Sequence, residues 1–234
     1  MRTQIITLCV LGSALSFPAF AAEGTGPYVE IAGGTSWANA IRFDVATTPN
    51  PTAAGIIVKH KTGKDLSIAL GHDFGFFRVE AEAAERDAPP SSLVTKVIVP
   101  ISRLAGANAP VTRAGTLTPI AGRSRARSAM VNLYLQTGDP EVTRFFVGAG
   151  AGYGRSYAHG YAMSTTAEVV RDHDGGKAWQ LLAGAREPIG THATIGVRYR
   201  YYHPDKMQVT DTLGRTLTGR LITHSIQASL GWRF

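Results

Sequence analysis

The sequence has little cysteine and, beyond its first residues, no long apolar segment. Cys9 is the only cysteine among 234 residues, and it lies in a short apolar run at residues 5–15. After Ala22 no stretch approaches the roughly 20 apolar residues that a membrane-spanning helix requires. We therefore expect an exported chain with neither a transmembrane helix nor a disulfide.

The first 21 residues have the pattern of a secretory signal peptide. Arg2 gives a positive start, residues 5–15 are the apolar run, and residues 19–21 read Ala-Phe-Ala, a typical cleavage site. We expect cleavage after Ala21, so that residues 22–234 form the exported domain and Cys9 is lost with the leader. Thr7 and Leu8, the neighbours of Cys9, do not resemble a bacterial lipoprotein box.

Bulk composition does not distinguish a soluble domain from a membrane barrel. The chain is 44% hydrophobic, with a mean hydropathy of -0.01 and a formal charge of +7. In a transmembrane barrel only alternate residues face lipid, so the average hydropathy stays ordinary. The positive charge makes anionic partners, notably lipid phosphates, the natural candidates.

Eight stretches alternate apolar and polar residues with the period of two that marks a strand with two different faces. In the last one, Ile226, Leu230 and Trp232 fall on one face, and Gln227 and Arg233 on the other. The eight stretches are residues 26–37, 65–74, 76–86, 126–136, 144–154, 177–187, 193–202 and 224–234.

The connections between these stretches alternate between long and short. The long ones cover about residues 38–64, 87–125, 155–176 and 203–221, and all of them follow odd-numbered strands. An up-and-down barrel places such loops at one end, as outer-membrane barrels do, whereas a Greek-key sandwich does not sort its loops in this way. The sequence therefore predicts one all-β domain, a transmembrane up-and-down antiparallel β-barrel of about eight strands. Its last strand would pair with its first.

Five segments carry a family resemblance. They are "GPYVEIAGG" at residue 26, "GHDFGFFRVEAEAAE" at 71, "FFVGAGAGYG" at 145, "GVRYRYY" at 196 and the terminal "LGWRF". In this order they resemble the opacity-protein and OmpA-like family of small outer-membrane β-barrels. The resemblance implies the Gram-negative outer membrane, transient recognition of Leu230, Trp232 and Phe234 by the barrel assembly machinery, and a porin-like, adhesive or structural role.

Strand alternation directs charges of both signs into the barrel. The inward set is Glu30, Arg78, Glu80, Glu82, Arg198 and Arg200. A barrel of about eight strands is only wide enough to be filled by side chains, so these charges are expected to form an ion-pair network that plugs the lumen. Glycines 148, 150, 152 and 154 would make room for the long arginines. The alternative is a gate or narrow conduction path through the same charges.

Acidic residues are absent from residues 88–138, where six cations remain. Three of them, Arg123, Arg125 and Arg127, would lie at the external rim of the fourth strand, and Lys59, Lys61 and Lys64 at that of the second. This charge suits the phosphates of lipopolysaccharide; a merely solvated loop is the alternative. Residues 92–100 would extend the barrel wall or offer an edge to a host or bacterial surface ligand. Without interleaved aromatics, nucleic acid is not an expected partner.

Enzymatic and metal sites find little support. Ser156, His159 and Glu168 are residue types of a catalytic triad, yet no histidine belongs to a His-x-Ser pattern. Residues 172–176 (DHDGG) lack the spaced carboxylates of a calcium loop and are interpreted as a turn. We expect no cofactor and no enzymatic activity. The prediction is a structural or surface-interacting barrel, with a narrow porin or a lipid A-modifying enzyme as alternatives.

Overall fold

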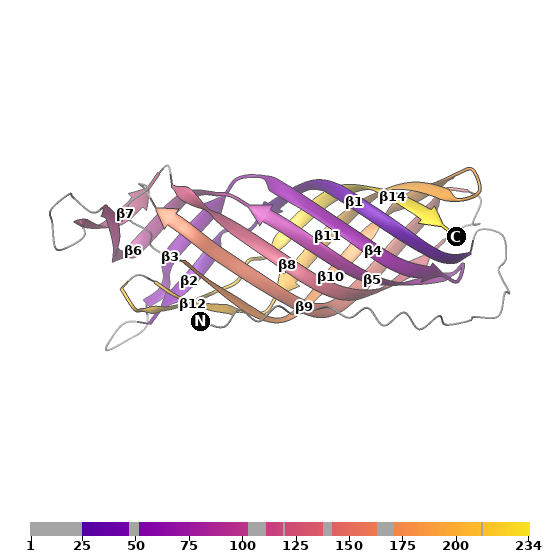
Figure 1. Cartoon of the computed structure of the whole chain (residues 1–234). Coiled ribbons are helices and arrows are strands. Elements are labelled where there is room, and N and C mark those ends of the chain that lie inside the picture. Colours follow the sequence, from indigo (N-terminus) through magenta and orange to yellow (C-terminus); the bar gives the residue numbers. More distant parts are fainter. Residues whose placement is uncertain are drawn as a thin grey trace, which may run out of the picture.

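A computed structural model shows the chain as a long closed barrel with a second sheet at one end (Figure 1). The structure describes residues 25–46, 52–102, 111–118, 120–137, 142–162, 171–211 and 213–234. Within these ranges no helix is long and apolar enough to cross a membrane. The predicted signal peptide and Glu168 lie outside the described residues.

The barrel contains all eight of the predicted strands, joined antiparallel in the order β1-β14-β11-β10-β9-β8-β5-β4. The prediction of an eight-stranded antiparallel barrel is thus confirmed. The strands are β1 (Gly26–Ala38), β4 (Gly63–Asp73), β5 (Phe77–Ala88), β8 (Ala121–Gln136), β9 (Arg144–Ala162), β10 (Arg171–Ile189), β11 (Ala193–Pro204) and β14 (Thr223–Arg233).

Pairing of β1 with β14 closes the barrel. Tyr28 lies opposite Arg233, and the ladder continues without interruption to Ala38 opposite Thr223. Short connections join β4 to β5, β8 to β9 and β10 to β11 at the end that also holds the carboxy terminus, here called the turn end (Figure 1). Gly75 and Gly190 have positive φ angles of 90° and 65° in two of these turns, a conformation that glycine adopts without strain.

The outer face of the barrel carries an apolar band between two aromatic belts. In β8, Val131 and Leu133 are 61% and 52% exposed on this face, whereas Asn132 between them is fully buried inside. At the turn end Phe74 stacks on Phe77, with 4.5 Å between ring centroids. The opposite end of the barrel is here called the loop end. At the edge of the apolar band nearer to the loop end, Trp179 stacks on His203, with 4.7 Å between ring centroids. An apolar band flanked by aromatic girdles is the lipid-facing surface of a membrane barrel.

The long connections build a second sheet at the loop end, of which the sequence analysis anticipated only one strand, in residues 92–100. The six strands follow the order β12-β13-β2-β3-β6-β7. They are β2 (Ile41–Val45), β3 (Thr52–His60), β6 (Pro90–Ser102), β7 (Val111–Leu117), β12 (Met207–Thr210) and β13 (Thr216–Gly219). The predicted loops therefore contain much regular structure, which prolongs the barrel beyond its apolar band.

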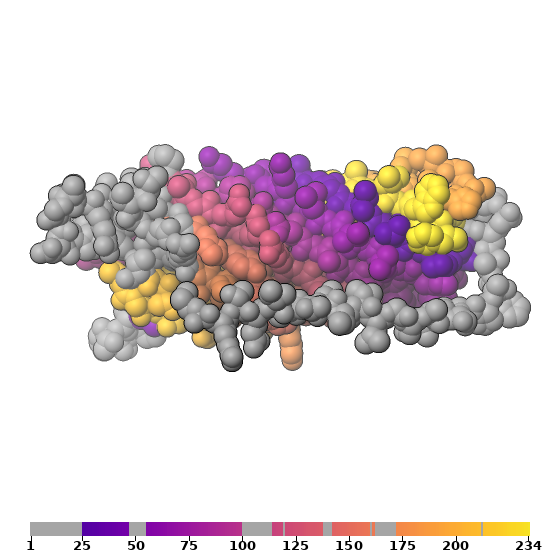
Figure 2. Space-filling model, in the orientation of Figure 1, coloured from indigo at the N-terminus to yellow at the C-terminus, as the bar shows by residue number. Residues whose placement is uncertain are grey.

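The second sheet packs on an apolar core that continues into the barrel. Ile41, Phe43 and Ile56 are fully buried, and they belong to one cluster with Tyr202 and Met130 from barrel strands. The interior thus changes character along the barrel axis: it is apolar toward the loop end and charged toward the turn end. The space-filling view shows β4, β5, β8 and β9 side by side as one continuous wall along this axis (Figure 2).

Two carboxylates join the edge strand β12 to barrel strand β10. The backbone N–H of Gln208 donates to Asp174 Oδ2 at 2.8 Å, and that of Thr210 donates to Asp172 Oδ2 at 3.0 Å. The interpretation of residues 172–176 as a turn is therefore wrong, because they belong to β10 and pair with β9. The aspartates instead accept hydrogen bonds from backbone N–H groups of β12, which would otherwise be unpaired at the edge of the sheet.

Gly148, Gly150 and Gly154 of β9 face inward as predicted, but arginines do not fill the space that they leave. A Cβ on Gly150 would lie 2.0 Å from the side-chain oxygen of Asn132, and one on Gly154 would lie 2.0 Å from the hydroxyl of Tyr202. A Cβ on Gly148 would lie 2.5 Å from a ring carbon of Tyr134. These glycines make room for the side chains of Asn132, Tyr134 and Tyr202. The prediction that they make room for arginines is therefore wrong.

Replacing Phe43 with alanine tests the apolar core of the second sheet. Because Phe43 is fully buried, the truncation should lower the free energy of unfolding by about 3–5 kcal/mol. Urea titration of the protein in lipid vesicles measures this loss. Arg42→Ala, which changes the exposed neighbour on the same strand, should have an effect below about 0.5 kcal/mol. Equal effects of the two changes would contradict the packing.

His60 should make the stability of the second sheet dependent on pH. Burial lowers the pKa of His60 from 6.5 to about 4, while its Nε2 lies 2.9 Å from Ser124 Oγ. The unfolded chain therefore binds more protons between these values, so stability is complete above about pH 6.5 and declines as the pH falls toward 4. Thermal unfolding from pH 7.5 to 4 should show a smaller decline for His60→Gln. Parallel curves for the two proteins would disprove this role.

Candidate functional site

The charged part of the lumen holds all six residues that strand alternation predicted there. Their exposed fractions are no higher than 5%. Glu30 pairs with Arg78 at 3.6 Å and with Arg198 at 3.1 Å. Glu82 pairs with Arg198 at 3.3 Å and with Arg200 at 2.5 Å. These residues come from β1, β5 and β11. Strand β4 joins the same network through Asp65.

Two members of this network were missed by the sequence analysis. Asp65 of β4 accepts two hydrogen bonds from Arg200, at 3.0 and 3.1 Å. Arg86 of β5 lies 3.3 Å from Asp65 and 3.8 Å from Glu82. Both follow the inward alternation of their strands, which would have been a sufficient signal. With them, four arginines face four carboxylates, Glu30, Asp65, Glu80 and Glu82.

Neutral polar and aromatic side chains add further contacts to the network. Tyr28 and Tyr134 donate their hydroxyl groups to Glu80 at 2.8 and 3.0 Å. The guanidinium of Arg78 lies 4.2 Å from the ring centroid of Tyr134, and that of Arg86 lies 4.1 Å from the centroid of Tyr202. Buried charges with this many partners avoid much of the desolvation penalty that an isolated charge would incur.

The network crosses the full width of the lumen. Strands β5 and β11 lie on opposite sides of the barrel, four places apart in the closed order of eight strands. Glu82 of β5 nevertheless contacts both Arg198 and Arg200 of β11 directly. Gln180 of β10 also donates to Glu82, at 3.1 Å. An ion that passed along the lumen would have to break these contacts.

A smaller charged cluster lies at the turn end. Asp73 pairs with Arg186 and, at 3.3 Å, with Arg144, and it accepts a hydrogen bond from Gln136 at 2.8 Å. These side chains are almost fully buried. The cluster adds a second layer of ion pairs below the main network.

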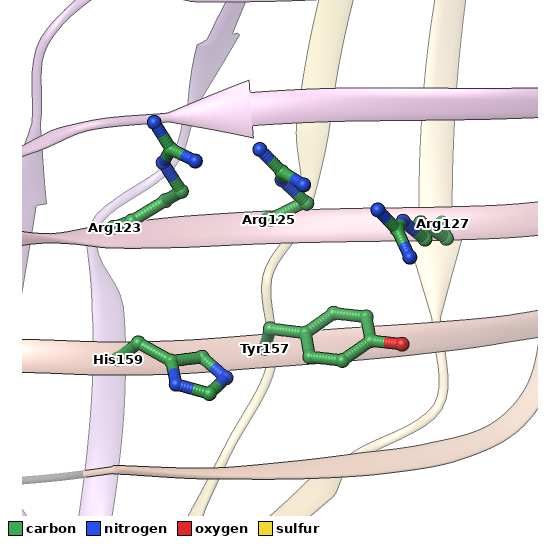
Figure 3. Close-up of a pocket in the computed structure, with 5 residues that line it drawn as sticks. All are labelled: Arg123, Arg125, Arg127, Tyr157 and His159. Carbon is green, nitrogen blue, oxygen red and sulfur yellow. The ribbon is translucent and has the colours of Figure 1, made fainter.

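A cationic pocket lies on the outside of the barrel wall, just beyond the apolar band. Arg123, Arg125 and Arg127 form a row along β8, with Tyr157 and His159 beside them on β9 (Figure 3). The recess has a volume of about 390 Å³. The three arginines were predicted as a cationic rim, whereas the two β9 residues were missed because only the pairing register brings them there.

Two carboxylates of β5 hold part of this arginine row in place. Arg127 Nε donates to Glu85 at 2.6 Å, and Arg125 Nε donates to Asp87 at 3.0 Å. Arg155 of β9 pairs in register with Arg127 and lies 6.0 Å from the ring centroid of Tyr157. Four arginines against two carboxylates leave an excess of positive charge on this part of the wall.

Other residues with predicted roles are placed apart from this pocket. Lys59, Lys61 and Lys64 are exposed, on β3, in the connection that follows it, and on β4. They are not among the residues that line the pocket.

Recognition of Leu230, Trp232 and Phe234 by the assembly machinery stays a prediction; all three are at least 51% exposed on the outer face.

The residues considered for catalysis do not come together. Ser156 is 3% exposed and faces the interior, whereas His159 lines the external pocket. An odd separation along one strand directs the two side chains to opposite faces. In the part of the chain that the structure describes, no group of three or more His, Cys, Asp or Glu side chains is placed to hold a metal ion.

Comparisons with known proteins agree with this architecture. The sequence model of the family described as "Outer membrane protein beta-barrel domain" matches residues 7–234. No curated protein matches the chain.

Two solved structures share the fold. The crystal structure of Neisserial surface protein A has a TM-score of 0.52 and 11% identity, over 89% of this chain and 97% of that one. The outer membrane protein OprG from Pseudomonas aeruginosa has a TM-score of 0.54 and 14% identity, with the same two coverages. At such low identity the likeness concerns the fold alone.

Removing one carboxylate tests the lumen network. Glu82→Gln removes one of the charged partners of Arg86, Arg198 and Arg200, so it should lower the free energy of unfolding by about 3–5 kcal/mol. Glu85→Gln, on the outer face of the same strand, should cost at most about 1 kcal/mol. Urea unfolding in lipid vesicles measures both.

In planar bilayers the folded wild-type protein should show no discrete conductance steps; such steps would mean that the lumen conducts.

Proposed function

The chain belongs to the outer membrane protein beta-barrel domain family, and we propose that it is a closed, non-conducting barrel whose outer wall binds lipopolysaccharide phosphates. The protein lies in the outer membrane of Gram-negative cells, as its family and fold indicate. In this orientation the loop end faces outward and the turn end faces the periplasm. The observation that carries the proposal is the arginine pocket at the outer edge of the apolar band.

The position and chemistry of the pocket both suit a lipid phosphate. The pocket adjoins the apolar band, at the depth where lipid head groups begin. Arginine presents a planar fork of donors that matches phosphate oxygens, and its charge does not depend on pH in the physiological range. Arg127 keeps 55% of its side chain exposed even while it pairs with Glu85, so part of its guanidinium stays available to an anion.

The lumen supports a surface role over a porin role. Glu82 joins opposite walls of the barrel, and the surrounding charges are balanced and buried. Conduction would need these ion pairs to separate inside a narrow, low-dielectric interior, at a cost of several kcal/mol. The opposed positions of Ser156 and His159 likewise favour a binding role over lipid A modification.

Removal of the two more exposed arginines of the row tests this function. Arg123→Gln combined with Arg127→Gln should weaken binding of lipid A tenfold or more, since hydrogen bonds to charged groups contribute about 1.5–3 kcal/mol each. Native mass spectrometry of the detergent-solubilised protein titrated with lipid A measures the affinity. Arg42→Gln, at an exposed arginine on β2, is the matched control and should leave binding unchanged.

A change of ligand completes the test. Lipid A without its phosphates should bind the wild-type protein as weakly as intact lipid A binds the double variant. If the double variant keeps wild-type affinity for phosphorylated lipid A, the pocket is not a phosphate site and the proposal fails.

A further inference from the structure

We propose that the arginine pocket is the head-group end of a longer groove, and that one acyl chain of lipid A lies in its lower part. This inference rests on the proposed function, because it names the lipid that the phosphate site would hold. It adds a requirement that phosphate binding alone does not make, namely that the acyl part of the ligand is also recognised. The groove is built on β4, β5, β8 and β9, which are adjacent in the barrel.

The lipid-facing wall below the pocket is hollowed where small side chains gather. A recess of about 520 Å³ is lined by the outward-facing alanines 81, 83, 129 and 151, with the larger Ile68 and Leu70 along one side. Large neighbours around small ones make a trough, since each methyl group ends several ångströms below the flanking side chains. Bulkier residues such as Leu181 and Ile226, about half exposed, cover other parts of the apolar band.

The recess and the arginine pocket are continuous. A third hollow, of about 430 Å³, shares Ile68 and Ala83 with the recess below it and Arg127 with the pocket above it. The strand register explains this continuity. Ala83 pairs with Ala129, and the next outward pair toward the loop end is Glu85 with Arg127. Successive outward residues along β8 therefore change from apolar to cationic without a break.

The dimensions suit an acyl chain that hangs from a head group at the arginines. From Arg127 to Val131 the strand advances four residues, or about 13 Å at roughly 3.3 Å per residue. One leaflet of the hydrocarbon core is about 15 Å thick. A chain in the recess would contact protein on its sides as well as below, and the resulting dispersion contacts would favour it over a chain that rests on a flat wall.

The charge above the trough selects the kind of lipid. Four arginines oppose two carboxylates around the pocket, which favours an anionic head group over a zwitterionic one. The three arginines on β8 form a row from Arg123 to Arg127. This row spans four residues, about 13 Å, which allows more than one phosphate to be contacted. Lipid A, with separated phosphates and several acyl chains, fits both parts of the groove. A phospholipid with a single phosphate fits less of it.

Filling the trough tests the inference separately from the phosphate site. Ala83→Phe and Ala129→Phe place a ring in the groove but leave every arginine in place. Each should lower the affinity for lipid A about tenfold and leave the affinity for its deacylated, phosphorylated disaccharide unchanged. Ala228→Phe is the matched control, because Ala228 is exposed on the outer face of β14 and pairs with Val197. A heat-dependent shift in gel mobility confirms that each variant is folded.

Each outcome separates the two proposals. If the groove variants bind lipid A as the Ala228→Phe control does, while the arginine double variant still binds it tenfold or more weakly, the acyl groove is overturned and the phosphate site stands. If the arginine variant binds both ligands normally, the phosphate site and the groove that depends on it are both overturned. If phosphatidylglycerol binds as tightly as lipid A and is equally sensitive to Ala83→Phe, the groove stands but lipid A is not its selected occupant.

Discussion

The architecture depends on the requirement that every backbone N–H and C=O within the membrane finds a partner in the protein. Pairing of β1 with β14 meets this requirement, because it leaves no open strand edge in the apolar band. Closure after eight strands also fixes the width of the barrel, and an interior of this width is filled by side chains. The ion-pair network follows from that constraint, since charges directed into so narrow a space have to pair with one another.

The interior is divided into an apolar part and a charged part, and side chains fill both. Toward the loop end the lumen is packed by the core around Phe43 and Tyr202. Toward the turn end it is crossed by the contacts of Glu82 and closed further by the cluster at Asp73. On the outer wall, strand alternation places arginines directly above alanines.

Alternation and loop length made much of this predictable. The eight strands and the inward-facing charges each depend on one strand's own period, which can be read without knowing its neighbours. Asp65 and Arg86 follow the same rule, since both are inward-facing and fully buried. Closure was predictable from the sorted loop lengths and from the cost of an open strand edge. The second sheet was harder to predict, because strands such as β12 and β13 have only four residues each, too few for a clear alternation.

The sequence by itself determined which face of each strand a residue occupies, and hence the barrel, its polar lumen and its apolar exterior. Only the tertiary structure decided which residues meet across strands, because the register between strands distant in the sequence depends on pairing and not on either strand alone. Tyr157 and His159 beside the β8 arginines, the alanine trough below them, and Glu82 between Arg198 and Arg200 all belong to this second group.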